Sequence, residues 1–225
     1  MVAASWHIAA KDLRLCLVRG GGLVQALLLG LLLLFVFSLS QQVGETMSAQ
    51  GAAAIFWLSS AFCQVLVFNM LYSLEEVNAS RLGLLLMPAP VQAVWLGKGL
   101  AGLVLLLLAQ LIFLPASVVF LGQHIGAAWP QALLMLFLVD VGMAALGSLL
   151  GALSQGQAAR ESLLSIVLFP LLVPLLLAGI RVGSAAFAAA MPEGAASWMG
   201  IAAAFDALFC GAGIVLFSFI YAGDD

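Results

Sequence analysis

Charged residues are scarce in this chain, since only 8% of its 225 residues are Asp, Glu, Lys or Arg while 65% are hydrophobic. A soluble domain carries about 25% charged residues, so the composition excludes a soluble protein and indicates an integral membrane protein. The formal net charge is only -3. Nucleic acids bind to clustered basic surfaces, which a chain with so few basic residues is not expected to form. We therefore expect this protein to contact the lipid bilayer and no nucleic acid.

Cysteine and histidine are also rare. The three cysteines, Cys16, Cys63 and Cys210, are odd in number and form no Cys-x-x-Cys pair, which argues against a disulfide framework or a redox motif. The only histidines are His7 and His124, so no metal-ligand cluster follows from their spacing. We therefore expect no metal site and no tightly bound cofactor. One alternative stays open: His124 is a weak heme-ligand candidate, because a single histidine can hold heme iron.

Motifs for ATP binding and for intramembrane catalysis are absent from the sequence. A P-loop reads G-x-x-x-x-G-K-[ST], but the Gly97-Lys98 pair has Gln92 in place of the first glycine. Asp140 and Asp206 lack the Tyr-Asp and Gly-x-Gly-Asp contexts of intramembrane aspartyl proteases. We expect no enzyme activity in this chain and assign ATP hydrolysis to a partner subunit.

Long apolar runs dominate what is present. A helix of about 20 apolar residues crosses the hydrocarbon core of a bilayer. The connections between the runs are far shorter than an independent domain of about 50 residues. The sequence therefore predicts an all-α integral membrane protein with six transmembrane helices, in which residues 1–225 form a single transmembrane domain. The spans are expected at about 23–40, 52–72, 95–121, 131–153, 163–180 and 198–221.

Residues 5–19 precede the first span and are too charged to cross a bilayer. We expect an interfacial amphipathic helix here; the alternative is an irregular basic flank. Cytoplasmic loops carry an excess of Lys and Arg, and in this topology Arg181 is the single basic residue on the external side. Both termini are therefore predicted to be cytoplasmic. The basic residues on their side are Lys11, Arg14, Arg19, Arg81, Lys98 and Arg160.

Ser73–Pro90 (SLEEVNASRLGLLLMPAP) is the largest cytoplasmic connection, and we call it the coupling segment. Glu75 and Glu76 are expected in the first turn of a short helix capped by its opening serine, where carboxylates favour the helix dipole. An apolar patch follows, and Pro88 would help to end the helix. Lys98, near the cytoplasmic end of the third span, is expected to extend its ammonium group to solvent. The alternative is a plain connector with solvated charges.

Polar residues inside the spans are functional candidates, because intramembrane carboxylates are costly and usually face the protein interior. Asp140 lies in the fourth span and Asp206 in the sixth, and Asn69 in the second span can bond to a neighbouring helix. The alternative for both aspartates is a structural hydrogen bond. Pro170 and Pro174 interrupt the fifth span, and we expect them to make it deformable.

Three stretches resemble one known family. They are residues 84–90 (LLLMPAP), residues 97–101 (GKGLA) and the double-proline stretch 165–176 (SIVLFPLLVPLL). Together they resemble the CcmB family, the membrane subunit of the heme exporter of cytochrome c maturation. The resemblance extends over nearly the whole chain. It implies an ABC-2-type permease fold of six helices with an amphipathic N-terminal helix, in a multi-pass protein of the bacterial inner (cytoplasmic) membrane.

The resemblance also implies partners. It predicts a CcmA-like ATPase that binds the ATP, CcmC-like and CcmD-like membrane proteins, and a CcmE-like periplasmic heme chaperone. In that family, ATP hydrolysis is tied to heme handling and to release of the loaded chaperone, so heme is the substrate of the complex. The permease subunit is not its main heme-ligating component. Two alternatives remain: an ABC-2 exporter for a lipid or drug, and a membrane scaffold that moves nothing.

One position departs from the pattern of related permeases, because Leu82 stands where an acidic residue is usual. Glu75 and Glu76 are then the acidic candidates, and Arg81 is expected to pair with one of them. Arg160 and Glu161 in the second cytoplasmic loop are further candidates. The residues expected to dock the ATPase are Glu75, Glu76, Arg81, Leu82, Leu85, Met87 and Pro88.

Overall fold

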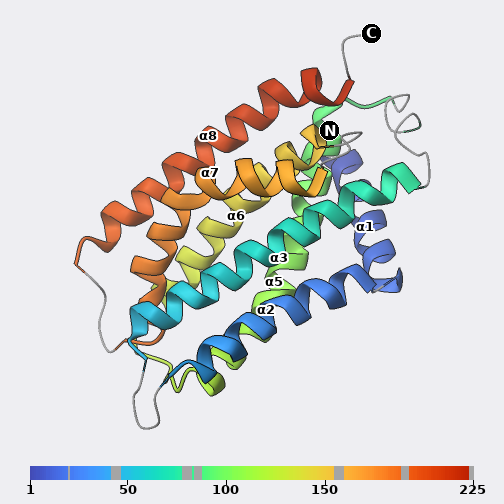
Figure 1. Ribbon diagram of the computed structural model, residues 1–225. Helices are drawn as coiled ribbons and strands as arrows, with labels where there is room; N and C mark the ends of the chain where they lie inside the picture. Colours follow the sequence, from blue (N-terminus) through green and yellow to red (C-terminus); the bar gives the residue numbers. More distant parts are fainter. Residues whose placement is uncertain are drawn as a thin grey trace.

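The computed structural model describes residues 1–19, 21–41, 47–77, 83, 88–154, 160–188 and 193–222, without the side chains of residues 19, 76, 77, 160–165, 221 and 222. Within these ranges the chain is helical and contains no strand, which confirms the predicted all-α class (Figure 1). The elements are α1 (Val2–Arg19), α2 (Gly21–Leu39), α3 (Ala49–Val77), α5 (Gln92–Phe120), α6 (Trp129–Leu153), α7 (Arg160–Gly183), the 3-10 turn η1 (Ser184–Ala186) and α8 (Ala195–Ala222).

Six of these helices are long and apolar enough to cross a membrane, as the sequence predicts: α2, α3, α5, α6, α7 and α8. Most of them begin and end within a few residues of the expected bounds. The largest difference is at the end of α3, which continues to Val77 instead of ending at residue 72. No proline or glycine interrupts residues 72–77, so the helix extends into the coupling segment.

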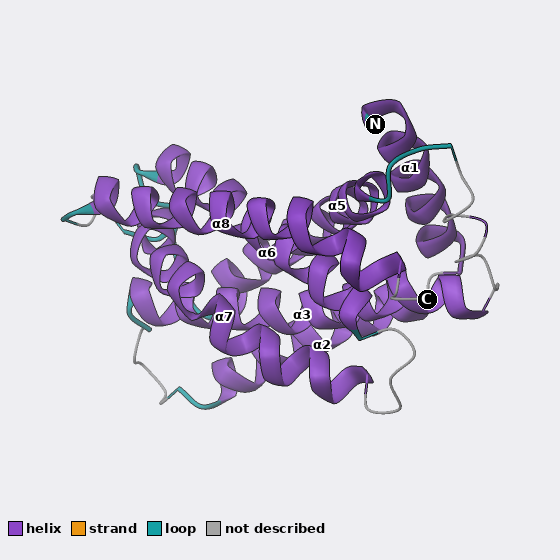
Figure 2. Ribbon diagram, turned by 90° about the horizontal axis from the view of Figure 1, so that it is seen from above, coloured by secondary structure: helices purple, strands orange, loops and turns teal. Residues whose placement is uncertain are grey.

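The six spanning helices form two layers, one above the other in Figure 2. One layer contains α8, α6 and α5, and the other contains α7, α3 and α2, with contacts between the layers along their length. Helix α1 lies outside both layers and packs mainly on α5. It meets the bundle at an angle, at the end where α8 also finishes (Figure 1). Both ends of the described chain therefore lie at one end of the bundle.

Aromatic rings bring the helices of the core close together by packing on glycines. Phe68 of α3 lies against Gly147 of α6, so a methyl group added at that glycine would collide with the ring. Tyr72 lies against Gly151 in the same way, one turn further along both helices. Small residues allow close approach of membrane helices, and these contacts hold α3 and α6 at the centre of the molecule.

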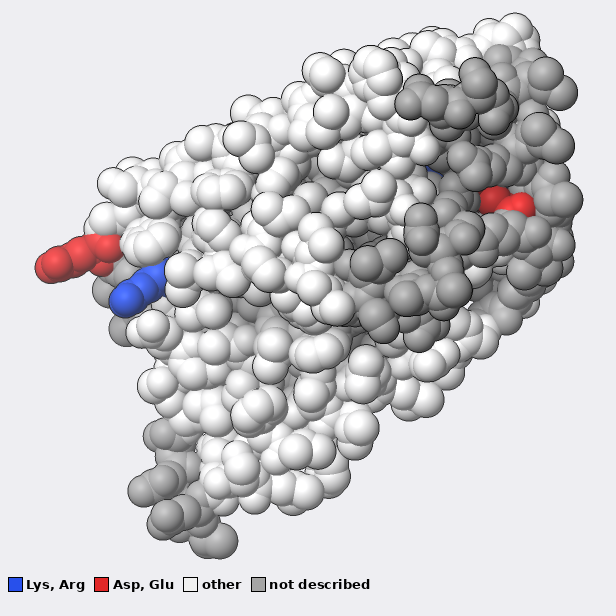
Figure 3. Space-filling view, turned by 45° about the horizontal axis from the view of Figure 1, so that its top comes forward, with Lys and Arg blue, Asp and Glu red and all other residues white. Residues whose placement is uncertain are grey.

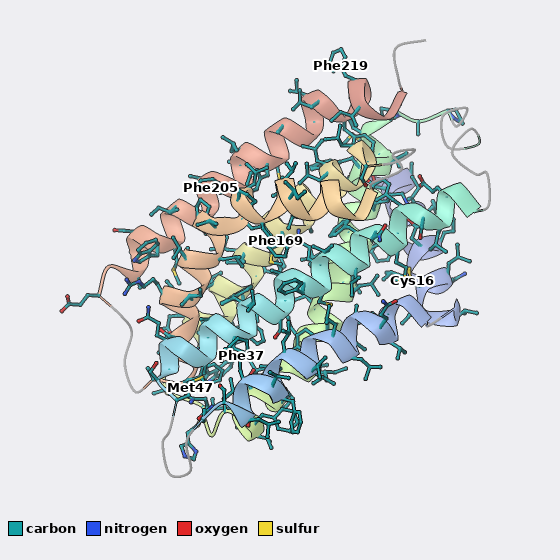
Figure 4. The ribbon with its side chains drawn as sticks, in the orientation of Figure 1. Cys16, Phe37, Met47, Phe169, Phe205 and Phe219 are labelled. Atoms are coloured by element: carbon teal, nitrogen blue, oxygen red, sulfur yellow. The ribbon has the colours of Figure 1, made fainter. Side chains whose placement is uncertain are left out.

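On the face drawn in Figure 3, the described surface between the ends of the bundle shows no charged side chain. In Figure 3 the acidic and basic atoms lie at the two ends of the molecule. Large apolar side chains are exposed along the spans, and Phe219 of α8 points away from the bundle in Figure 4. Exposed apolar bands of this extent are typical of protein that faces lipid, because water would not solvate them.

Helix α1 covers the stretch 5–19, which the sequence predicts to be helical, and buries one face against the bundle. Ile8, Asp12 and Cys16 follow one another at intervals of four residues and are buried against the bundle, while Trp6 and Leu17 are exposed. Cys16 is labelled in Figure 4. Burial, with the nearby Asp12 carboxylate, raises the pKa of the Cys16 thiol to about 11. A carboxylate on the buried face of this helix needs a cation as its partner.

Candidate functional site

Lys98 lies in the second turn of α5 and is fully buried, with 0% of its side chain exposed. Its Nζ lies 2.8 Å from Oε1 of Glu75 on α3 and 3.2 Å from Oδ2 of Asp12 on α1. It also donates a hydrogen bond of 2.8 Å to the carbonyl oxygen of Leu71. The prediction that Lys98 extends to solvent is therefore wrong, because two buried carboxylates attract its ammonium group into the helix junction.

The charges around Lys98 are balanced. Lys11, which is partly exposed, places its Nζ 3.0 Å from Oδ1 of Asp12, so two ammonium groups face two carboxylates. The ring centroid of Tyr72 lies 4.6 Å from the Lys98 Nζ, a cation–π distance. A buried charge without its partner costs several kcal/mol, so each group in this set depends on the others.

A chain of hydrogen bonds continues from Tyr72 to α6. Its hydroxyl donates to the carbonyl oxygen of Ser148 at 2.6 Å and lies 2.9 Å from Oγ of the same residue. Ser148 Oγ donates to the carbonyl oxygen of Trp95 at 2.9 Å, and the Trp95 indole donates to Ala145 at 3.2 Å. We call Asp12, Tyr72, Glu75, Lys98 and Ser148 the Lys98 cluster. It links α1, α3, α5 and α6.

The Lys98 cluster lies at the base of the coupling segment. Glu75 is in the last turn of α3, and Lys98 follows the start of α5 by six residues, so their ion pair joins the two helices that the segment connects. The prediction that Glu75 starts a new helix capped by Ser73 is wrong. Both residues belong to α3, and the Ser73 hydroxyl donates to the carbonyl oxygen of Met70. Glu75 is buried and does not offer a free carboxylate to a partner.

The rest of the predicted docking set is only partly described. Pro88 is exposed between α3 and α5, and its role in docking stays a prediction. Three candidates lie in the described helices, but the structure does not describe their side chains. They are Glu76 at the end of α3, and Arg160 and Glu161 at the start of α7. Four others, which lie outside the described residues and stay predictions, are Arg81, Leu82, Leu85 and Met87.

A second polar cluster lies deeper in the bundle, around Asp140. Its carboxylate is fully buried and accepts a hydrogen bond of 2.8 Å from Nε2 of Gln110 on α5. The same amide lies 3.3 Å from Oγ of Ser60 on α3. Gln64 donates to the carbonyl oxygen of Met143 at 2.6 Å, one turn further along α3. Asp140 thus faces the protein interior and accepts a hydrogen bond from one neutral amide of α5, which in turn lies beside Ser60 of α3.

The structure does not bring the two intramembrane aspartates together. Asp206 of α8 is buried against Gly142 of α6, where an added methyl group would collide with its carboxylate. Residues 140 and 142 point about 200° apart around α6, so the two carboxylates lie on different sides of that helix. Asn69 is half-buried on α3. Among the described residues, no three His, Cys, Asp or Glu side chains come together to hold a metal ion.

Three further candidates lie on α7 and in the turn before α6. Pro170 and Pro174 both lie inside the continuous helix α7, which bends along its length in Figure 1. A proline removes a backbone donor and is a common cause of such bends. His124 is exposed in the turn between α5 and α6.

The sequence interpretation missed several members of the Lys98 cluster, namely Asp12, Tyr72 and Ser148. One signal was available for Asp12, which lies between Ile8 and Cys16 on the face of residues 5–19 that is otherwise apolar. A carboxylate in that register indicates a buried cation partner. Nothing in the sequence links Tyr72 to Ser148, which are 76 residues apart.

Comparison with known proteins identifies the family. A family profile described as "CcmB protein" matches residues 3–222, almost the whole chain. No curated protein matches the chain. The six apolar helices and the family agree in describing a multi-pass membrane protein that is a transporter subunit and not itself an enzyme. The chain therefore belongs to the CcmB family, the membrane subunit of a heme exporter for cytochrome c maturation.

Proposed function

We propose that this subunit couples ATP hydrolysis by a CcmA-like partner ATPase to delivery of heme to, or release of, a CcmE-like periplasmic chaperone. The complex would lie in the bacterial inner membrane and include CcmC-like and CcmD-like membrane proteins. Heme is its handled substrate, and ATP binds in the partner. The observation that supports this proposal best is the Lys98 cluster, which ties both ends of the coupling segment to four helices.

The coupling step depends on a difference between two states of the complex. An ATPase that closes on ATP must contact the coupling segment differently before and after closure, because a contact of equal strength in both states shifts no equilibrium. Movement of the segment would act on the end of α3 and the start of α5, which Glu75 and Lys98 hold together. The Lys98 cluster would then move α1, α3 and α5 as one body against α7, where two prolines permit bending.

The docking surface is expected on the segment itself. Glu75 is buried in an ion pair with Lys98. The remaining candidates for contact with the ATPase are Glu76, Arg81 and the apolar residues before Pro88. Removing the two remaining charges should weaken ATPase binding without disturbing the Lys98 cluster. The test is to prepare the double variant Glu76→Ala/Arg81→Ala, then to measure copurification of the ATPase and heme loading of the chaperone by the complex.

A matched control removes the same number of charges at the other end of the molecule. Arg181 is in the last turn of α7, and Glu193 is exposed just before α8. The double variant Arg181→Ala/Glu193→Ala should keep ATPase copurification and heme loading at the level of the unsubstituted protein. If the Glu76→Ala/Arg81→Ala variant does the same, the proposed docking surface is wrong.

A further inference from the structure

An apolar cavity of about 370 Å³ lies at the end of the bundle opposite to the Lys98 cluster. Its walls come from the first turns of α3 and α6, the end of α5, and η1 with its flanking residues; they include Ala53, Phe56, Trp57, Trp129, Ala132 and Leu133. Trp57 precedes Glu75 by 18 residues on α3, which separates the cavity from the Lys98 cluster by about 27 Å along the helix. The cavity is thus independent of the proposed coupling site.

The lining chemistry limits what the cavity can hold. The twelve described residues that line it are all apolar or aromatic, and none is charged or is a His, Cys or Met. None of these side chains carries a positive charge to pair with a carboxylate or phosphate, and none can ligate heme iron. The volume falls in the range of small-molecule sites, roughly 300 to 1,000 Å³. An uncharged hydrocarbon group is the chemical class that fits.

The cavity opens on the lipid-facing surface. Three of its lining residues, Ile125, Trp129 and Leu133, are more than half exposed and form its rim. The exposed apolar face of α6 continues from Leu133 to Phe137, one turn deeper in the same span. The rim is therefore continuous with the surface that contacts the bilayer, and the molecules next to it are lipids.

The depth of the cavity matches one leaflet. Trp57 is eight residues from the start of α3, which corresponds to about 12 Å, and Leu136 is seven residues from the start of α6, about 10 Å. Half of a hydrocarbon core of about 30 Å spans a similar distance. We propose that the cavity binds one acyl chain of a phospholipid from the external leaflet, with its headgroup at the rim near Trp129.

Tryptophan fluorescence tests this proposal, because Trp57 lines the cavity yet is only 1% exposed. Bulk lipid cannot contact its ring, whereas a chain inside the cavity would lie beside it. The full chain with Trp57 as its single tryptophan, the other four replaced by Phe, is reconstituted in vesicles of dioleoylphosphatidylcholine or of its dibrominated form. Bromine quenches indole at short range. We expect at least a twofold loss of Trp57 emission in the brominated vesicles.

Trp95 supplies the matched control, because it is equally buried at 5% exposed and is not part of the cavity. A chain with Trp95 alone should keep its emission in brominated vesicles. Filling the cavity by Ala132→Phe, or by Ala53→Leu if the first variant does not fold, should restore most of the Trp57 emission. The same filling substitution is also made in the chain whose single tryptophan is Trp95. Unchanged Trp95 emission in that variant shows that the fold is kept.

Three results would overturn the proposal. The first is a Trp57 that is quenched no more than Trp95. The second is quenching of Trp57 that neither filling variant reduces, since the bromine would then reach the ring by another route. The third is quenching by added hemin but not by bromolipid, which would identify a tetrapyrrole as the occupant. None of these results bears on the ATPase, so this proposal and the proposed coupling function fail separately.

Discussion

Glu75 at the end of α3 and Lys98 near the start of α5 form a buried ion pair, with 2.8 Å between the carboxylate oxygen and the ammonium nitrogen. The coupling segment connects the two helices that this pair joins. The carboxylate of Asp12 on α1 also contacts the Lys98 ammonium group. A charged group of this kind, placed at the base of a connection, can hold two helices together while the connection moves.

Breaking this ion pair should destabilise the protein strongly. Lys98→Met leaves two buried carboxylates without their shared cation, and loss of one partner of a buried pair costs about 3–5 kcal/mol. Lys11→Met, at the partly exposed cation of the same cluster, should cost about 0–1 kcal/mol. The free energy of unfolding, measured by denaturant titration in detergent, distinguishes the two. Equal losses would show that Lys98 is not the centre of the cluster.

Neutralising all three charges together should recover most of that loss. The triple variant Asp12→Asn/Glu75→Gln/Lys98→Met keeps similar side-chain volumes and leaves no buried charge unpaired, while the Lys11 ammonium group stays partly exposed. Its free energy of unfolding should lie closer to that of the unsubstituted protein than to that of Lys98→Met. A triple variant less stable than Lys98→Met would contradict the pairing.

The hydroxyl of Tyr72 should make a modest, separable contribution. Tyr72→Phe keeps the ring over Lys98 and on Gly151 but removes the hydrogen bond to Ser148. The net contribution of such a bond is about 0.5–1.5 kcal/mol. The same unfolding titration measures it. In the double variant Tyr72→Phe/Ser148→Ala, the losses should be less than additive, because the two groups interact.

Close helix packing predicts a contrast between two glycines. Gly151→Ala places a methyl group against the Tyr72 ring and should cost about 1–3 kcal/mol, whereas nothing lies within 4 Å of the same group at Gly211. Gly211→Ala should be neutral or slightly stabilising, because Ala favours the helix. Thermal unfolding in detergent compares the two variants. Equal effects would mean that α3 and α6 are less closely packed than described.

The thiol of Cys16 should react slowly. Thiol reagents attack the thiolate, and burial raises the pKa of Cys16 to about 11, so its thiol keeps its proton below that pH. Compared with an ordinary thiol of pKa 9.0, the thiolate fraction at pH 8 is about a hundredfold lower. Alkylation of native Cys16 should be slower than that of Leu17→Cys in a Cys16→Ala background, and should accelerate as the pH rises toward 11. Equal rates would contradict its burial.

The spanning helices could be predicted from the sequence because each is a long apolar run, and hydrophobicity alone decides which segments cross a bilayer. The end of α3 could not be placed this way. Glu75 is charged, and a charged residue after an apolar run is typical of a loop unless a buried partner pairs with it. That partner, Lys98, is 23 residues further along the chain, and Asp12 is 86 residues before it. Tertiary pairing of charges has no signature in local composition.

The intramembrane carboxylates show the same limit. Their interior position follows from the cost of a charge in lipid, and both Asp140 and Asp206 are buried as that argument requires. Which groups they meet depends on how α5 and α8 pack on α6. The contact between Asp140 and Gln110 joins residues 30 positions apart and needed the structure.

Coupling through the Lys98 cluster is the central claim, and the heme delivered to the chaperone per ATP hydrolysed tests it most directly. The variant Asp12→Asn/Glu75→Gln/Lys98→Met should assemble with the ATPase and hydrolyse ATP, because residues 76–90 of the coupling segment are unchanged. Without the ion pair that joins α3 to α5, its heme delivered per ATP should fall at least tenfold. A ratio equal to that of the unsubstituted complex would contradict the claim.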